Sequence, residues 1–362
     1  MEPRVLQVLG RSAGGIARHV AQVTEQLDGD GFAVDIAGPP DLPVQMPKPL
    51  HDVSIPNGPV AGHRRAVTRL RAIVSRGRYD VVHAHGLRAG IDSALASRGG
   101  PPVLLTVHNL VHRDVAGRLK APVYRRAEGL AVRLTDHTFA VSDDIARHLR
   151  RLSAGRDKVE VLYLGIGDPP AVSRAPSEVR RELGVAENDG LIVTASRLAP
   201  QKALHVMLDA LARLERVVLA VLGTGPLESE LRTRAAAAGV GDRVRWLGFR
   251  ADAVDYVAAA DAFCLSSVWE GVPLAAQEAI LLGVPVVATA VGGMPELVED
   301  GVTGRLVPPG DAAALAGAME RVLADRGVAQ EYAAAARAHL EARFSTARML
   351  DRLASAYRDC AI

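Results

Sequence analysis

Short segments rich in Val, Ile and Leu alternate with amphipathic helical segments along the whole chain. Residues 5–9, 191–195 and 262–266 are apolar runs of strand length. Successive parallel strands need a crossover connection, usually a helix, so helices come to cover both faces of the sheet. The alternation therefore predicts an α/β fold built on parallel sheets.

The chain length predicts two domains, because 362 residues are too many for one ordinary core and the composition, 49% hydrophobic and 23% charged, is normal for a globular protein. Glycine and proline cluster at residues 164–176, between two strand–helix patterns. We expect domains at residues 1–168 and 169–345. A C-terminal helix at residues 346–362 should pack back on the first domain.

Charge and apolar runs limit the compartment and the partners. Residues 1–165 hold 23 Lys and Arg against 16 Asp and Glu, a net charge of +7, which favours an acidic or membrane-associated partner.

No run approaches the roughly 18 apolar residues of a membrane span, and the run at residues 5–9 is too short for a signal peptide. Cys264 and Cys360 show no metal-binding spacing. We expect a cytoplasmic protein that binds no nucleic acid.

The segment W-E-G-V-P-L-A-A-Q-E-A-I at residues 269–280 places two carboxylates around the start of a predicted helix. Pro273 is expected at the first helical position, so the free N–H groups of residues 274–276 would point out of the helix start, where the macrodipole favours a phosphate. Glu270 and Glu278 would flank that phosphate, and carboxylates accept hydrogen bonds well from sugar and ribose hydroxyls. The segment predicts a nucleotide-sugar site. The alternative is a surface-loop glutamate and a solvated helix position.

A second segment, residues 194–211, runs from a strand through a basic loop into a helix with an apolar face. The loop carries Arg197 and Lys202, and only 4 of the 43 basic residues in the chain are lysines. An ammonium and a guanidinium together can neutralise a diphosphate and stabilise it as a leaving group. The alternative is an ordinary basic loop.

Taken together, these segments resemble the retaining glycosyltransferases of family 4, of the glycosyltransferase group 1 type. The similarity covers nearly the whole chain and includes further motifs in the same order: Gly14-Gly15, D-V-V-H-A-H (80–85), T-V-H-N (106–109), V-S (141–142), G-T-G-P (223–226), W-L-G-F (246–249) and V-G-G-M-P-E-L-V-E-D-G-V-T-G (291–304). The resemblance implies the GT-B fold, two facing Rossmann-like domains with parallel sheets and a cleft between them. It also implies that the first domain binds the acceptor and the second the nucleotide sugar.

The resemblance assigns three groups of site residues by position. The expected catalytic residues are His108, Arg197, Lys202 and Glu270. The expected donor-binding residues are Gly14, Gly15, Gly271, Val272, Leu274, Ala275, Glu278, Gly248 and Arg250. The expected acceptor-side residues are His85, Asn109 and Ser142. Without the resemblance, a lone histidine such as His108 is more often structural.

The implied chemistry is transfer with retention and without a metal. Arg197 and Lys202 would stabilise the departing diphosphate, while Glu270 would orient the sugar and Glu278 would hold the ribose.

No metal site is expected. The triplet Asp-Gly-Asp at residues 28–30 lies where Asp-Gly indicates a turn. His83 and His85 share a strand face, but no third ligand follows at a convincing spacing. No cofactor is expected beyond the nucleotide-sugar co-substrate.

We therefore predict a glycosyltransferase that moves a hexosyl group from a nucleotide diphosphate sugar, a UDP-sugar first and GDP-mannose next, to a hydroxyl acceptor. The acceptor would belong to a cell-envelope glycan, a glycolipid or a small-molecule glycoside. The alternatives are a sugar-nucleotide epimerase of the same fold and a non-catalytic nucleotide-binding protein.

Residues 63–79 form a basic segment with one apolar helical stripe. In related enzymes that glycosylate lipids, a basic helix of this domain binds anionic membrane, so Arg64 to Arg78 could make a peripheral contact with the inner membrane face. The stripe could equally pack on the sheet and leave a solvated basic surface.

Overall fold

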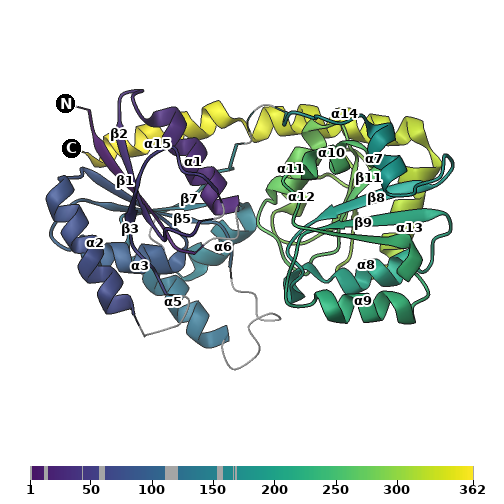
Figure 1. Ribbon diagram of the computed structural model, residues 1–362. Helices are drawn as coiled ribbons and strands as arrows, with labels where there is room; N and C mark the ends of the chain where they lie inside the picture. Colours follow the sequence, from purple (N-terminus) through teal and green to yellow (C-terminus); the bar gives the residue numbers. More distant parts are fainter. Residues whose placement is uncertain are drawn as a thin grey trace. The chain divides into compact units, whose positions relative to one another are not determined.

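The computed structural model describes residues 2–11, 15–42, 44–56, 62–110, 121–152, 158–165, 167 and 169–361. It divides the chain into two compact units (Figure 1). Unit 1 comprises Met1–Gly165 and Thr346–Ile362, and unit 2 comprises Ile166–Ser345. The division thus falls three residues before the expected boundary at residue 168, and the C-terminal helix belongs to unit 1.

Unit 1 is built on a parallel sheet with the strand order β3-β2-β1-β4-β5-β6-β7 among the described residues. The strands are β1 (Arg4–Leu9), β2 (Ala33–Gly38), β3 (Leu50–Asp52), β4 (Val81–His85), β5 (Val103–Val107), β6 (His137–Ala140) and β7 (Val159–Val161). The helices are α1 (Gly15–Leu27), α2 (His63–Gly77), α3 (Leu87–Ala96), α5 (Ala121–Leu134), α6 (Asp143–Leu152) and α15 (Thr346–Cys360).

Unit 2 is built on a second parallel sheet with the order β10-β9-β8-β11-β12-β13. The strands are β8 (Gly190–Ala195), β9 (Val217–Leu222), β10 (Val244–Gly248), β11 (Ala262–Leu265), β12 (Val286–Thr289) and β13 (Arg305–Val307). The helices are α7 (Pro176–Glu182), α8 (Leu204–Leu211), α9 (Glu228–Ala237), α10 (Ala253–Ala258), α11 (Leu274–Leu281), α12 (Met294–Leu297), α13 (Ala312–Ala324) and α14 (Arg326–Arg343), with 3-10 turns η1 (Pro200–Lys202) and η2 (Gly241–Arg243).

The burial of the strands explains why they are apolar throughout instead of alternating. Every residue of β4, β5 and β9 is buried. Helices lie on both faces of each sheet (Figure 1), so neither face of a central strand meets water. The predicted parallel α/β architecture is confirmed in both units.

Each sheet reverses its strand order once, between β1 and β4 in unit 1 and between β8 and β11 in unit 2. At such a point the loops that leave the carboxyl ends of neighbouring strands turn to opposite faces, and ligands of open α/β sheets bind there. The topology therefore brings the loop after β8, with Arg197 and Lys202, next to the loop after β11, with Glu270.

The C-terminal helix α15 is held in unit 1 by the polar contacts of two side chains, Tyr357 and Arg352. The buried Tyr357 hydroxyl lies 2.9 Å from Gln7 Nε2 and 2.6 Å from His83 Nδ1. Arg352 makes a bidentate ion pair with Glu160 of β7, with both N···O distances at 2.7 Å. These contacts join the end of the chain to strands β1, β4 and β7.

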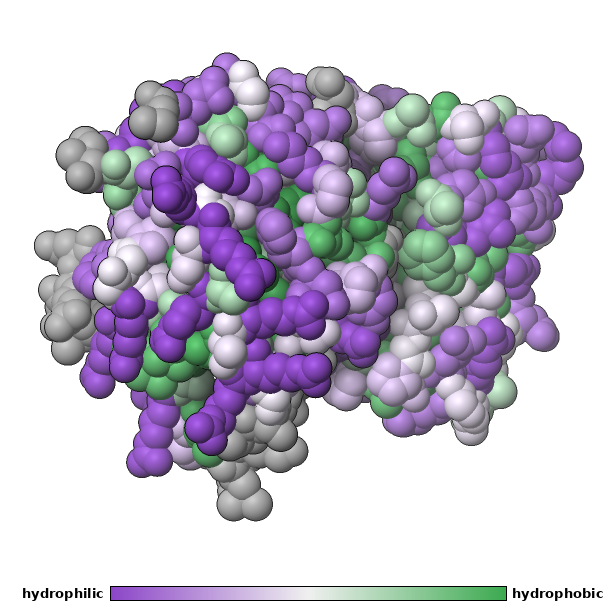
Figure 2. Space-filling view, turned by 60° about the vertical axis from the view of Figure 1, so that its left-hand side comes forward, coloured by the Kyte–Doolittle hydropathy of each residue, from purple (hydrophilic) through white to green (hydrophobic). Residues whose placement is uncertain are grey.

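The basic helix α2 uses its apolar stripe inside unit 1. Ala66, Leu70 and Val74 are buried in the core cluster, with two partly buried residues packed against it. The arginines stay exposed: Arg64, Arg65, Arg69, Arg71, Arg76 and Arg78. Figure 2 shows a largely hydrophilic surface with separate apolar patches. The stripe is thus not available to a membrane, and the expected membrane contact has no support beyond the basic surface itself.

Among the described residues, no helix is long and apolar enough to span a membrane.

Candidate active site

The central feature of unit 2 is an ion pair between two of the predicted catalytic residues, the partly buried Lys202 and the buried Glu270. Glu270 is only 4% exposed, and its Oε1 accepts a hydrogen bond from Lys202 Nζ at 2.5 Å and another from Ser267 Oγ at 2.5 Å. Removing one member of a buried pair leaves an uncompensated charge and costs about 3 to 5 kcal/mol. The structure thus couples two side chains that lie 68 residues apart in the sequence.

Backbone contacts hold the two loops together beside this pair. Val268 N–H donates to the Gln201 carbonyl at 2.9 Å, and Gln201 Nε2 donates to the Trp269 carbonyl at 2.9 Å. Ser266 Oγ donates to the Lys202 carbonyl at 3.0 Å. The position of Lys202 against Glu270 is therefore determined by the main chain as well as by charge.

Glycines of two motifs allow these loops to approach other backbone closely. A Cβ on Gly292 would lie 1.7 Å from the Glu270 carbonyl oxygen, and one on Gly293 would lie 2.3 Å from the Gly271 carbonyl oxygen. Gly293 N–H also donates to both carbonyls, at 3.2 and 3.0 Å. The V-G-G-M motif therefore supports the Glu270 loop, a role that sequence reasoning did not assign.

The G-T-G motif has the same role for the loop after β8. A Cβ on Gly223 would lie 2.1 Å from the Ser196 carbonyl oxygen, and one on Gly225 would lie 2.3 Å from the Leu198 carbonyl oxygen. These contacts are on either side of Arg197. The two glycines of the G-T-G motif were visible in the sequence, but the sequence did not show which loop they pack against.

The start of α11 differs from the prediction by one residue. Pro273 is the N-cap residue, not the first helical residue, and its carbonyl accepts the Ala276 N–H at 3.1 Å. The expected set of three free N–H groups is therefore reduced, because Ala276 is already bonded. Leu274 and Ala275 have no backbone acceptor among the described residues, so their N–H groups and the helix dipole form the anion-binding end.

The other predicted donor-side residues occupy different environments. Arg197 is exposed, Gly271 and Glu278 are partly buried, and Val272 is buried. Arg250 forms a bidentate ion pair with Asp252 at 2.7 Å for both contacts, so its guanidinium is engaged within unit 2.

Gly248 ends β10 beside β9, and its carbonyl accepts the Gly223 N–H at 2.7 Å. The next residue, Phe249, is 78% exposed, a large apolar surface that sequence reasoning did not single out.

In unit 1, His85 and His108 lie at the carboxyl ends of β4 and β5. His85 Nδ1 is 3.1 Å from His108 Nε2, and His85 Nε2 is 2.7 Å from Gln7 Oε1. Because Gln7 donates its amide N–H to Tyr357 and accepts at its oxygen, His85 carries its proton on Nε2 and presents a lone pair from Nδ1. His108 then donates from Nε2, which leaves its Nδ1 as an acceptor for a hydroxyl.

Burial keeps these imidazoles neutral. It lowers the pKa of His83 to about 3, and it lowers the pKa values of His85 and His108 well below the usual range, with neighbouring histidines adding to the effect. His83 is fully paired, since its Nε2 lies 2.7 Å from Thr106 Oγ1 and its Nδ1 contacts Tyr357. His85 is 3% exposed, so it lies behind His108 and presents little surface to an acceptor.

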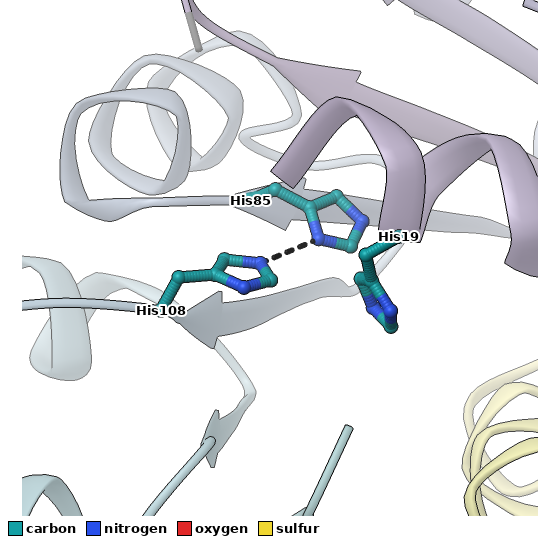
Figure 3. A group of neighbouring side chains, drawn as sticks. All are labelled: His19, His85 and His108. Carbon is teal, nitrogen blue, oxygen red and sulfur yellow. Dashed lines mark hydrogen bonds between the residues drawn. The ribbon is translucent and has the colours of Figure 1, made fainter. Parts of the chain in front are cut away.

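A third histidine joins this pair, although the sequence spacing showed no third ligand. His19 extends from α1 toward His85 and His108 (Figure 3). The ligand atoms of the three histidines all lie within 4.8 Å of one another. Helix α1 follows β1, which pairs with β4, and this pairing brings residue 19 to the end of β4.

The remaining predicted residues of unit 1 are placed as follows. Asn109 is exposed, and Gly15 is the first residue of α1. Ser142 is fully buried, and its Oγ accepts the Ile145 N–H at 3.3 Å, so it caps the first turn of α6. Gly14 lies outside the described residues.

Family models match the two halves of the chain separately. The model of glycosyl transferases group 1 matches residues 177–339. The model of Glycosyltransferase Family 4 matches residues 13–168. Both matches lie in the halves where the sequence motifs predicted them.

Relatives extend the similarity over nearly the whole chain. A D-inositol 3-phosphate glycosyltransferase of Geodermatophilus obscurus is 33% identical and covers 95% of this chain and 84% of the relative. A protein of the same name from Kribbella flavida is 30% identical and covers 91% of this chain and 87% of the relative.

Solved structures show the same fold. HepE from Anabaena, crystallised with UDP-glucose, superposes with a TM-score of 0.82 at 25% identity, over 98% of this chain and 99% of that one. Sucrose-phosphate synthase from Thermosynechococcus elongatus superposes with a TM-score of 0.85 at 22% identity over 98% of both chains. This second similarity shows a shared fold. The two units therefore define a glycosyltransferase of the GT-B class.

The chain belongs to the group 1 glycosyltransferases of family 4. The predicted family and the fold class of two Rossmann-like domains are thereby confirmed.

Proposed function

We propose that this glycosyltransferase moves a hexosyl group, with retention and without a metal, from a UDP-sugar to a hydroxyl of an anionic small-molecule acceptor. GDP-mannose is the second candidate donor, and glycan and glycolipid acceptors are the alternatives. The observation that carries the proposal is the Lys202–Glu270 pair. It lies where the strand order reverses, and Glu270 is four residues before Leu274, the first of the two α11 residues whose N–H groups have no backbone acceptor among the described residues.

The pair supports donor chemistry because each member suits a different part of a nucleotide sugar. The Lys202 ammonium and the exposed Arg197 guanidinium suit the diphosphate, together with the N–H groups of Leu274 and Ala275. The Glu270 carboxylate suits the sugar hydroxyls, and Glu278 suits the ribose. In the protein alone, Lys202 and Glu270 neutralise each other, so the site does not hold an unpaired buried charge before the donor arrives.

Three further observations support the choice of nucleotide, of acceptor and of cellular compartment. HepE, the relative crystallised with UDP-glucose, favours UDP as the nucleotide. The relatives named D-inositol 3-phosphate glycosyltransferases and the basic character of residues 1–165 favour an anionic polyol over a neutral glycan. Cys264 and Cys360 are free thiols, which fits the reducing cytoplasm.

The mechanism follows from the same residues. Charge develops on the diphosphate oxygen as the sugar leaves, and Lys202 and Arg197 stabilise it without reorganisation. The departing oxygen then accepts the proton of the acceptor hydroxyl on the same face, which gives retention.

The first test is binding and donor cleavage in EDTA. UDP at about 100 times its dissociation constant should stabilise the protein by about 2.7 kcal/mol, whereas GDP and ADP should stabilise it less. Release of UDP from UDP-glucose, with and without D-inositol 3-phosphate, reports turnover, and the anomeric proton coupling of the product reports retention. Stabilisation by none of the nucleotides would refute the donor assignment, and an inverted product would refute retention.

Variants of the ion pair separate catalysis from stability. Lys202→Met and Glu270→Gln should each lower turnover by about 10²- to 10³-fold. Lys202→Met also leaves the Glu270 carboxylate without its cation, so it should destabilise unit 2, and adding Glu270→Gln should restore stability but not turnover.

The matched control is Lys48→Met, because Lys48 also makes an ion pair, with Asp28 at 2.6 Å, and neither residue is among the predicted site residues. Its turnover should equal that of the parent protein. Normal turnover in the double variant would refute the assigned roles of Lys202 and Glu270.

A further inference from the structure

Three imidazole rings in unit 1 form a nearly equilateral triangle. The ring centroids of His19, His85 and His108 are separated by 5.5 Å, 5.4 Å and 5.4 Å. Imidazoles bound to one tetrahedral ion through bonds of about 2.05 Å place their centroids about 5 Å apart. The rings come from three different elements, α1, β4 and the residue after β5 (Figure 3).

One pair of ring nitrogens has the separation that a tetrahedral ion needs, and the His19 ligand nitrogen lies within 4.8 Å of both. His85 Nδ1 and His108 Nε2 are 3.1 Å apart, and two nitrogens on a tetrahedral zinc lie about 3.3 Å apart. His85 already presents a lone pair from Nδ1. His108 can present one from Nε2 if its single proton moves to Nδ1, so both rings bind an ion in their neutral forms.

The third ring supplies independent evidence, because its polar atoms have no partner. His19 is 2% exposed, and neither of its ring nitrogens has a hydrogen-bond partner in the described part of the chain. A buried polar group without a partner is destabilising, so it indicates a partner outside the protein chain, an ion or an ordered water. Burial lowers the pKa of His19 to about 4, which leaves the imidazole unprotonated near neutral pH, as metal binding requires.

We infer that His19, His85 and His108 form a three-imidazole site for a divalent transition-metal ion of the Zn²⁺ type. Imidazole nitrogens suit zinc, cobalt and nickel, whereas Mg²⁺ and Ca²⁺ prefer oxygen ligands. Three protein ligands leave a fourth position for water or another ligand.

A second layer of contacts fits the same assignment. Gln7 Oε1 accepts the Nε2–H of His85 at 2.7 Å, and Gln7 is itself oriented by Tyr357. A hydrogen bond from the opposite ring nitrogen is what usually orients a metal-bound histidine. The site contains none of the diphosphate-neutralising residues Arg197 and Lys202. It includes His108 and His85, which the family resemblance assigns to the sugar and acceptor side, and the ion is assigned no step in the proposed transfer.

The test uses the full-length protein without a histidine tag, stripped of metal with a chelator that is then removed. Titration with Co²⁺ should give one equivalent of a tetrahedral visible absorption band, and Zn²⁺ should abolish the band by displacement. Mg²⁺ should leave it unchanged. His19→Leu keeps an apolar side chain of similar size in the core and should weaken binding at least about tenfold, since one of three ligands is lost.

Two further variants make the result decisive. His205→Leu removes an exposed histidine of α8 and should leave the band unchanged. His108→Ala changes a more exposed ligand, so it provides the same loss of binding if His19→Leu fails to fold. Absence of the band in the parent protein, or an equal band in the folded His19 or His108 variant, would overturn the proposal.

Discussion

Gly292→Ala should disable the donor site by moving the Glu270 loop. The new Cβ would lie 1.7 Å from the Glu270 carbonyl oxygen, whereas real Cβ atoms essentially never approach closer than 3.0 Å. One backbone must therefore shift by about 1.3 Å, and a misplacement of about 1 Å at a reacting centre can lower turnover about 10²-fold. The φ angle of Gly292 is +53°, which for alanine costs about 1 to 2 kcal/mol more.

The matched control for this prediction is Gly283→Ala. Gly283 also has a positive φ, +73°, but a Cβ there would meet nothing within 4 Å. Both variants therefore carry the backbone penalty, and only Gly292→Ala carries the collision with Glu270. UDP release from UDP-glucose and thermal unfolding of both variants measure the two effects. Equal turnover in the two variants would refute the argument that the V-G-G-M glycines position Glu270.

Three other outcomes are expected. Gly225→Ala should lower turnover, because its Cβ would lie 2.3 Å from the Leu198 carbonyl oxygen; unchanged UDP release would contradict this. Gly317 lies in helix α13, where an added Cβ would meet no atom within 4 Å. Gly317→Ala should therefore raise the free energy of unfolding by about 0.5 to 1 kcal/mol, as measured by denaturant titration. Burial would raise the pKa of Glu160, but the side chains of His137 and Arg352 outweigh it and lower the pKa to about 2. The stability from this depressed pKa is present above pH 4.5 and is lost as the pH falls toward 2. Glu160→Gln should therefore lower the free energy of unfolding of unit 1 by about 1 to 2 kcal/mol at pH 7, allowing for screening of a one-third-exposed group, and by little at pH 2. Hydrogen exchange of unit 1 at both pH values measures this loss, and an equal loss at the two values would contradict the prediction.

Several features of the site were predictable because they depend on neighbours in the sequence. Strand–helix–strand alternation specifies parallel sheets, in which the carboxyl ends of the strands lie at one edge and ligands bind. The family resemblance assigned Lys202 and Glu270 to one site, and the structure placed β8 beside β11 and so brought the two side chains together. The prediction for the first turn of α11 was one residue off, because whether Pro273 is the N-cap or the first helical residue depends on the entry angle of the chain.

Contacts between distant segments could not be predicted in the same way. The alternation of apolar segments and the motifs determined the α/β class, the family resemblance and the donor-site candidates. Only the tertiary structure decided that Arg250 is held by Asp252, that Gly292 supports Glu270 and that His19 completes a cluster with His85 and His108. The physical reason is that strand pairing and helix packing determine which side chains meet, and spacing along the chain carries no such information when the partners belong to different elements.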